Sequence, residues 1–195
     1  MRRVGWLMAA PAVWAAATFV APVDSVRAAK PVERLTALAV DMSNMAGARN
    51  TATVDIVIDR WSTDAERDQL RAALREGGAD GLLHALQKVK EVGRISSAGS
   101  LGYPLRFARQ TTSPSGGRRI LMGTDRLISF LELRDQPRTV DYPFMVIDIR
   151  LDASGKGEGK LMPLAKITED RDHMVEIENY ASEPVRLTAV QSMNK

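Results

Sequence analysis

The 195-residue chain has no cysteine and only two histidines, His84 and His173. Without cysteine it can form no disulfide bond, no thiolate zinc site and no iron–sulfur cluster, and it has no thiol nucleophile. Two histidines also fall short of the three in a His₃ catalytic zinc site. We therefore expect neither a metal site nor a bound cofactor, and the fold must be held by its apolar core.

The excess of positive over negative charge is also small once the first 28 residues are left out of the count. The whole chain carries 27 Lys and Arg against 24 Asp and Glu, a net charge of +3. Residues 1–28 contain three arginines and one aspartate, so the remainder keeps 24 basic and 23 acidic residues, a net charge of +1. A near-neutral chain with 5% aromatic residues lacks the basic surface and the stacking platform of a nucleic-acid-binding protein. We expect no nucleic-acid partner.

The N-terminal segment has the layout of a secretory signal peptide. Arg2 and Arg3 precede an alanine-rich apolar stretch over 4–23, and Val26 and Ala28 place short side chains at the two positions that a signal peptidase reads. This predicts a signal peptide over 1–28, cleavage after Ala28, and a periplasmic or secreted mature chain with no membrane span. A retained anchor is the alternative, because a span needs about 20 apolar residues. Two prolines inside the stretch favour cleavage.

Residues 29–195 are expected to form a single β-rich domain. Short runs with period-two alternation, separated by turn residues, predict an antiparallel β-sandwich or barrel. In the first run Leu38, Val40 and Met42 alternate with smaller or polar residues, although a helix over 32–45 also fits. The predicted strands cover 34–42, 51–61, 92–98, 104–111, 118–124, 127–134, 143–151, 159–167, 173–180 and 185–192.

A helical pair is predicted as an insertion at about 63–91, which makes the fold class mainly β, or β-rich α+β. Thr63 and Glu66 have the spacing of a capping box, and Gly77-Gly78 ends the first helix before Asp80 caps the second. The helical period turns His84 toward solvent. We expect the pair to pack over one opening or edge of the sheet, and to cover the strand over 127–134, which is apolar on both faces.

Few stretches of the chain could carry chemistry. The loop 152–159 superficially resembles a calcium loop, but Lys156 stands among the oxygen side chains, and a glycine-rich hairpin tip explains it better. Ser100 lies between glycines without the GxSxG spacing of a serine nucleophile. His173 follows an acidic turn, as a general base could. The carboxylate pairs Asp55 with Asp59 and Glu176 with Glu178 fit a solvent-exposed strand face. No catalytic residue is assigned.

The middle of the chain is rich in arginine. Residues 88–138 contain ten basic and four acidic side chains, a net charge of +6, whereas the flanking segments 29–87 and 139–195 are net acidic. Arg106, Arg118, Arg119 and Arg126 are therefore the candidate ligand-binding residues, since arginine binds carboxylate and phosphate through paired hydrogen bonds. The competing interpretation, which we favour, is that these arginines pair with carboxylates of neighbouring strands.

Several short motifs carry a resemblance. They are Asp59-Arg60-Trp61-Ser62, Glu66-Arg67, Thr124-Asp125-Arg126 and Gly157-Glu158-Gly159-Lys160-Leu161. With these motifs, residues 51–190 resemble a set of predicted exported bacterial proteins that has no assigned function. The resemblance implies one continuous mature domain, and it supplies no activity, ligand or catalytic residue.

Together these features predict an exported, non-enzymatic binding or envelope-associated protein. Its expected partner is a small ligand or an envelope protein, and a ligand would sit in the mouth of the barrel or sandwich. One alternative is a secreted or periplasmic hydrolase that uses carboxylates or His173. The other is an interaction module that presents its arginine-rich face to an acidic partner.

Overall fold

The computed structural model describes residues 30–41, 50–114, 116–126, 140–170, 172, 174–180 and 183–194. The predicted signal peptide, the predicted strand over 127–134, and His173 lie outside these residues. Within them the chain forms ten strands and one kinked helix, α1 (Asp64–Lys88). The strands are β1 (Glu33–Asp41), β2 (Asn50–Ile58), β3 (Gly93–Ser97), β4 (Tyr103–Leu105), β5 (Phe107–Thr112), β6 (Arg118–Asp125), β7 (Phe144–Leu151), β8 (Lys156–Glu169), β9 (Val175–Asn179) and β10 (Val185–Ser192). This confirms the predicted β-rich fold with antiparallel strands and an inserted helical pair.

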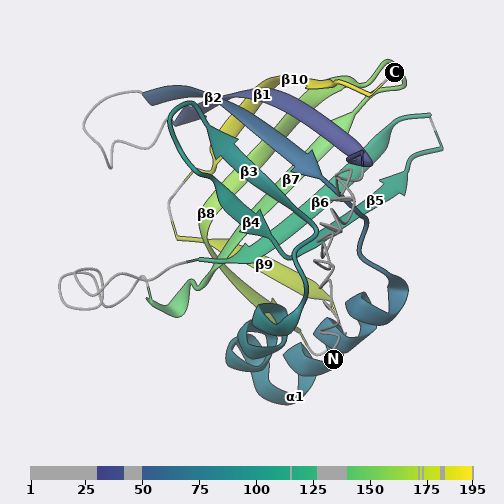
Figure 1. Ribbon diagram of the computed structural model, residues 1–195. Coiled ribbons are helices and arrows are strands. Elements are labelled where there is room, and N and C mark those ends of the chain that lie inside the picture. Colours follow the sequence, from purple (N-terminus) through teal and green to yellow (C-terminus); the bar gives the residue numbers. More distant parts are fainter. Residues whose placement is uncertain are drawn as a thin grey trace, which may run out of the picture.

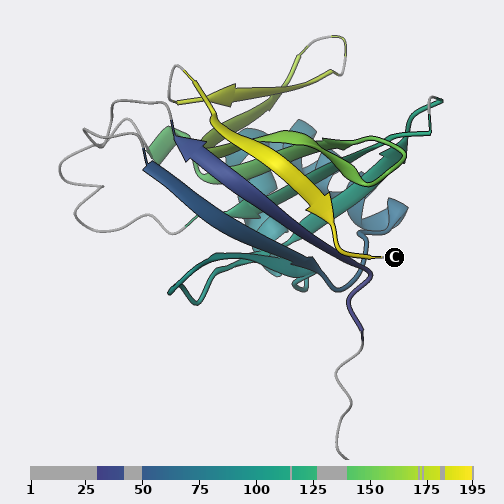
Figure 2. The ribbon, with the colours of Figure 1, turned by 90° about the horizontal axis from the view of Figure 1, so that it is seen from above.

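All ten strands belong to one antiparallel sheet. Its order is β4-β3-β2-β1-β10-β8-β7-β6-β5, and β9 pairs with the far end of β8. The sheet folds over on itself, so that β1 to β4 lie across β5 to β8 in two crossing layers (Figures 1 and 2). The hydrogen-bonded order is open between β4 and β5, yet these two strands are consecutive in the chain. They meet at Arg106, whose backbone N–H donates to Gly123 O at 3.1 Å.

The first strand is confirmed as a strand, and the face that carries Leu38 is not the buried one. Leu35, Ala37 and Ala39 point into the core, whereas the Leu38 side chain is 40% exposed. Apolar residues occupy both faces of this segment, so hydrophobicity alone does not distinguish them. The register with β2 and β10 decides which face is buried.

The helical insertion follows the predicted pattern. The Thr63 hydroxyl accepts from the Glu66 backbone N–H, and the Glu66 carboxylate accepts from the Thr63 N–H at 2.8 Å, so the capping box is complete. Gly78, with φ of 59° and ψ of −149°, divides α1 into two segments. His84 is exposed, as expected. No helix in the described ranges combines the length and apolarity that crossing a membrane requires.

Two apolar clusters hold these layers together. The interior cluster fills the space between the folded halves of the sheet, with residues such as Leu35, Ile56 and Ile147. The second cluster lies between α1 and the outer face of the sheet, where Leu70 and Leu74 meet Phe144 and other strand residues. The helical pair therefore covers an outer face of the sheet, which corrects the predicted position over an opening or edge. Beneath the helix, β7 places Phe144 and Val146 in this second cluster and Ile147 and Ile149 in the interior cluster.

Candidate functional site

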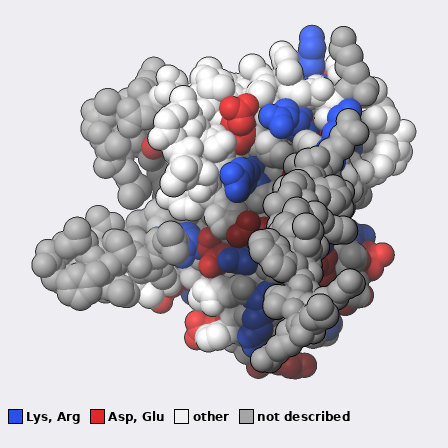
Figure 3. Space-filling view, viewed as in Figure 1, with Lys and Arg blue, Asp and Glu red and all other residues white. Residues whose placement is uncertain are grey.

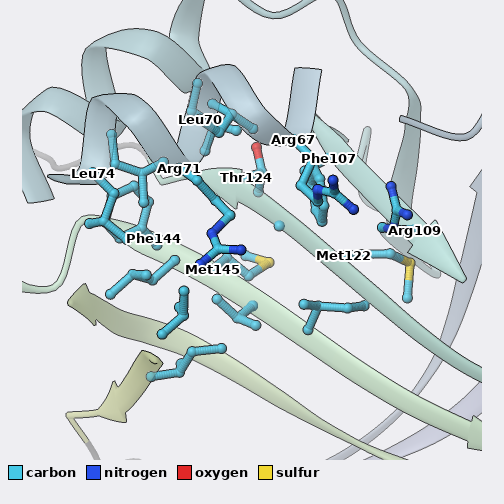
Figure 4. A pocket seen from close by; sticks show the side chains of 18 of the residues that line it. Arg67, Leu70, Arg71, Leu74, Phe107, Arg109, Met122, Thr124, Phe144 and Met145 are labelled. Carbon is cyan, nitrogen blue, oxygen red and sulfur yellow. The ribbon is translucent and has the colours of Figure 1, made fainter. Parts of the chain in front are cut away.

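A pocket of about 300 Å³ lies between α1 and the outer face of the sheet (Figure 4). The helix contributes two leucine pairs, and the strands contribute aliphatic and aromatic side chains from β5, β6, β7, β8 and β9. The apolar residues of its wall are Leu70, Leu74, Leu82, Leu86, Phe107, Leu121, Met122, Phe144, Met145, Val146, Ile167, Val175 and Ile177. The interior of the folded sheet is filled by its own core, so the pocket is on the opposite side of β6 and β7 from that core.

The helical wall follows directly from residue spacing. Leu70 with Leu74, and Leu82 with Leu86, are each four residues apart, which places each pair on one helical face. All four leucines are buried and line the pocket. The kink at Gly78 separates the two pairs, so both segments of the helix contribute to the same wall.

The sheet wall has a recess at Gly123 of β6. Gly123 pairs with Phe107 of β5 and Val146 of β7, and all three residues line the pocket. A Cβ atom built at Gly123 would have one neighbour within 4 Å, the backbone oxygen of Met145 at 3.9 Å. The missing side chain therefore leaves space in the wall, and a Cβ atom fits there without a backbone clash.

The charged residues that line the described part of the pocket are all arginines. They are Arg67 and Arg71 from α1, Arg109 from β5 and Arg119 from β6. In Figure 4, Arg71 extends from the helix toward Met145, whereas Arg67 lies at Phe107 and Arg109 lies further to the right. Although each arginine has a carboxylate partner, those carboxylates are not part of the wall.

The arginine partners differ in how firmly they are held. Arg119 binds both oxygens of Asp148, with Nε–Oδ1 and Nη2–Oδ2 distances of 2.8 and 2.9 Å. Arg71 Nη2 lies 3.8 Å from Glu169 Oε1, and the Glu169 side chain is only 5% exposed. Arg119 is therefore held by a bidentate pair, whereas Arg71 makes a longer ion pair with a buried carboxylate.

A different arrangement is found where α1 begins. Arg109 Nη1 donates to Asp64 Oδ1 at 2.6 Å, and Arg67 Nη1 lies 3.3 Å from the same oxygen. The Asp64 side chain is 73% exposed. The hydrogen bond from Arg109 and the charges of Arg109 and Arg67 lower the pKa of Asp64 below its ordinary value, so this carboxylate is ionised at neutral pH. Arg67 also binds Asp68 at 2.7 Å.

The four arginines singled out from the sequence do not converge. Arg119 alone among them lines the pocket. Arg106 holds the β4–β5 corner, with Nε 3.0 Å from Asp125 Oδ1 and Nη1 2.9 Å from Val89 O. Arg118 lies inside the folded sheet against Glu33, and Arg126 Nε donates to Tyr142 O. Arg118 and Arg119 pair with carboxylates from the two acidic segments that flank the arginine-rich middle.

Sequence reasoning missed Arg67, Arg71 and Arg109 as pocket residues. On a helix or strand considered alone, these arginines look like ordinary surface charges. The usable signal was the apolar stripe of Leu70 and Leu74 beside Arg67 and Arg71, which marks one face of α1 as covered. The leucine stripe could not indicate which strand face covers the helix, because Phe107 and Leu121 follow Leu74 by more than 30 residues in the chain.

The other candidate chemistry has structural explanations. Asp152 Oδ1 accepts hydrogen bonds from Ser154 N, Ser154 Oγ and Lys156 N, so this side chain organises a hairpin turn. Ser100 Oγ accepts from Gly102 N at 3.1 Å in a turn of its own. Asp55, Asp59, Glu176 and Glu178 are exposed. Among the residues that the structure describes, no three His, Asp or Glu side chains are grouped closely enough to hold a metal ion.

On the face that Figure 3 shows, charges of both signs surround the helix. In Figure 3, basic and acidic side chains lie next to one another around α1 in the lower part of the view. This is consistent with the ion pairs that the described arginines make with neighbouring carboxylates.

No protein-family model, no curated protein and no solved structure matches this chain. The predicted resemblance to exported bacterial proteins therefore stays a prediction. Functional inference has to start from the pocket between α1 and the sheet, because it is here that the described residues combine open space, apolar walls and charges of one sign.

Proposed function

We propose that this protein is an exported binding protein that takes up a small, largely apolar ligand between α1 and the outer face of the sheet. The observation that carries the proposal is the pocket of about 300 Å³ walled by the leucines of α1 and by Phe107, Leu121 and Phe144. This volume is at the lower end of the range of roughly 300–1,000 Å³ that is typical of ligand pockets.

Physical chemistry supports an apolar occupant. Burying apolar surface contributes about 25 cal/mol per Å², so a hydrocarbon that contacts both walls would gain affinity without any polar contact. Among the described residues, Ile56, Ile147 and Leu187 lie inside the folded sheet and are fully buried. The proposed ligand site therefore lies outside the folded sheet, not in its mouth.

Export is part of the proposal because residues 1–28 have the signal-peptide layout described above. The expected setting is the periplasm or the extracellular medium, where a carrier of apolar molecules would keep them dissolved. No geometric feature of the described residues favours the alternative of a hydrolase.

A substitution that fills the pocket tests the proposal. Gly123→Leu places a side chain in the open recess of β6, and we expect it to weaken binding of the uncharged fluorescent probe N-phenyl-1-naphthylamine by about tenfold or more, or at least about 1.4 kcal/mol. The measurement is a fluorescence titration with the purified protein. Gly77→Leu is the matched control, because a Cβ at that exposed position meets nothing within 4 Å and the residue is not part of the wall.

Retained affinity in Gly123→Leu, or equal losses in both variants, would contradict the proposal. Circular dichroism of both variants establishes that they are folded. A probe that fails to bind the unmodified protein would also contradict it, as would a dimer in which a second copy of the chain covers the pocket.

A further inference from the structure

We infer that the natural ligand is a single-chain carboxylate whose head group binds between Arg67 and Arg109, in the place that the Asp64 carboxylate now occupies. This inference rests on the proposed function, and it names the chemical class of the ligand and the residues that select it. The hydrocarbon chain would lie along the leucines of α1.

The sign of the charge comes from the wall. Within the described residues, an occupant of the pocket meets four arginines and no acidic side chain. A cationic head group would therefore face like charge, and a neutral one would leave the guanidinium groups without a new partner. Arginine donates paired hydrogen bonds that match the geometry of a carboxylate.

The position of the head group follows from which arginines can change partner. Arg119 is bound through two hydrogen bonds to Asp148, and Arg71 points to the buried carboxylate of Glu169. Arg67 Nη1 and Arg109 Nη1 both contact Asp64, whose side chain is 73% exposed. Arg67 makes this contact while its Nε and Nη2 stay on Asp68 at 2.9 and 2.7 Å, so only its Nη1 has to change partner. Exposed ion pairs contribute about 0–1 kcal/mol, so a ligand carboxylate can replace this one at little cost.

Asp64 also shows which head group the arginines accept. Its carboxylate oxygen lies 2.6 Å from Arg109 Nη1 and 3.3 Å from Arg67 Nη1, so two arginines from different elements already converge on one carboxylate. When a ligand displaces it, Asp64 can turn into solvent because it belongs to the first turn of the helix. Asp64 therefore acts as an internal competitor for the site.

Pocket size limits the hydrophobic part of the ligand. A volume of about 300 Å³ suits one short hydrocarbon chain and leaves little room for the two chains of a phospholipid. The apolar wall runs from Phe107, near Arg67 and Arg109, to Leu74 and Phe144 at the other side of the view (Figure 4). A chain that starts at the two arginines can thus follow the leucine face of α1.

The test compares three probes of equal chain length by isothermal titration calorimetry. We expect decanoate to bind up to about fivefold more tightly than 1-decanol, because its carboxylate pairs with the two arginines at an exposed position, and decylammonium to bind most weakly. Added salt should weaken decanoate binding and leave 1-decanol binding nearly unchanged.

Two variants and one control locate the head group. The double variant Arg67→Gln with Arg109→Gln should lose the preference for decanoate but still bind 1-decanol. Asp64→Asn should raise the affinity for decanoate several-fold, because the competing charge is removed. A loss of fold alone could not cause that gain. Arg94→Gln, on an exposed residue of β3 outside the wall, is the matched control and should behave like the unmodified protein.

The outcomes separate this inference from the proposed function. Equal binding of decanoate and 1-decanol, or a decanoate preference that survives in the double variant, would overturn the inference and leave the proposed function standing. An unchanged or lower decanoate affinity in Asp64→Asn would overturn the competitor role and with it the assigned position. Binding of neither probe would remove the proposed function itself.

Discussion

Glu33 is a buried charge that connects distant parts of the sheet. It is 2% exposed on the inward face of β1. Its Oε2 accepts from Arg118 Nη1 of β6 at 2.5 Å, and its Oε1 accepts from the Ser192 hydroxyl of β10 at 2.6 Å. Arg118 Nη2 also donates to Ser192 Oγ at 3.2 Å. A carboxylate in this position is tolerated because its charge and both of its oxygens have partners.

Replacing this carboxylate should destabilise the fold. We expect Glu33→Gln to lower the free energy of unfolding by about 1–3 kcal/mol, because Arg118 loses its ionised partner. The loss is smaller than for a fully buried pair, since 27% of the Arg118 side chain is exposed and water can solvate part of its charge. Urea denaturation followed by circular dichroism measures it. Glu176→Gln, on the exposed face of β9, is the control and should change stability by less than about 0.5 kcal/mol. Equal losses of unfolding free energy in the two variants would show that the Glu33–Arg118 pair does not stabilise the fold.

At the scale of the element, the kink in α1 determines the shape of the pocket wall. Gly78 has φ of 59° and ψ of −149°, a conformation that is essentially restricted to glycine. Its neighbour Gly77 has no such requirement. Both glycines are exposed, and a Cβ atom at either position would meet nothing within 4 Å. The two glycines therefore separate the effect of backbone conformation from that of packing.

This pair gives a matched prediction. Gly78→Ala should lower the free energy of unfolding by about 1–3 kcal/mol and weaken probe binding, because the strained backbone would relax and move Leu82 and Leu86. Gly77→Ala should be neutral or stabilising by up to about 1 kcal/mol, because alanine has the higher helix propensity. Thermal or urea unfolding, together with the fluorescence titration, measures both. If the two variants have the same stability, the kink is not needed.

Elements were largely predictable from local patterns, and the site was not. The Thr63–Glu66 capping box and the break at Gly77-Gly78 marked the helical pair correctly. The predicted strand over 104–111 was partly wrong, because Arg106 turns the chain from one end of the sheet to the other and divides the segment into β4 and β5. Arg119 was identified as a candidate, but Arg67 and Arg109 were not, since their proximity arises only when α1 packs over the sheet.

At the scale of the whole molecule, the first and the last described strands lie side by side in the middle of the sheet. β1 pairs with β10, and β10 pairs with β8 (Figure 2). The last described strand therefore joins the layer of β1 to β4 to the layer of β5 to β8. Beyond the strands, Met193 N donates to Arg34 O at 2.8 Å, and Asn194 Nδ2 donates to Val32 O at 2.6 Å. The described domain thus depends on residues from Val32 onward.

The predicted cleavage after Ala28 would leave all of these contacts intact. We expect protein recovered from the extracytoplasmic fraction of a bacterial host to have the intact mass of a chain that starts at Ala29, and to unfold cooperatively. A chain that starts at Ala37 lacks Glu33 and Leu35 and should not unfold cooperatively. Mass spectrometry and urea denaturation measure the two outcomes. The mass of the full 195-residue chain in the membrane fraction would instead favour a retained anchor.

The sequence by itself determined the absence of thiol chemistry and the alternation that makes strands. It also determined the capping hydrogen bonds that begin α1 and the glycine that divides the helix. These features depend on residues that are neighbours in the chain. Tertiary structure alone decided which face of β1 is buried, how Glu33 meets Arg118, and where a pocket lined by arginines opens. Each of these is a contact between segments far apart in sequence, and the free energy of such contacts depends on the mutual packing of whole elements, which local patterns do not specify.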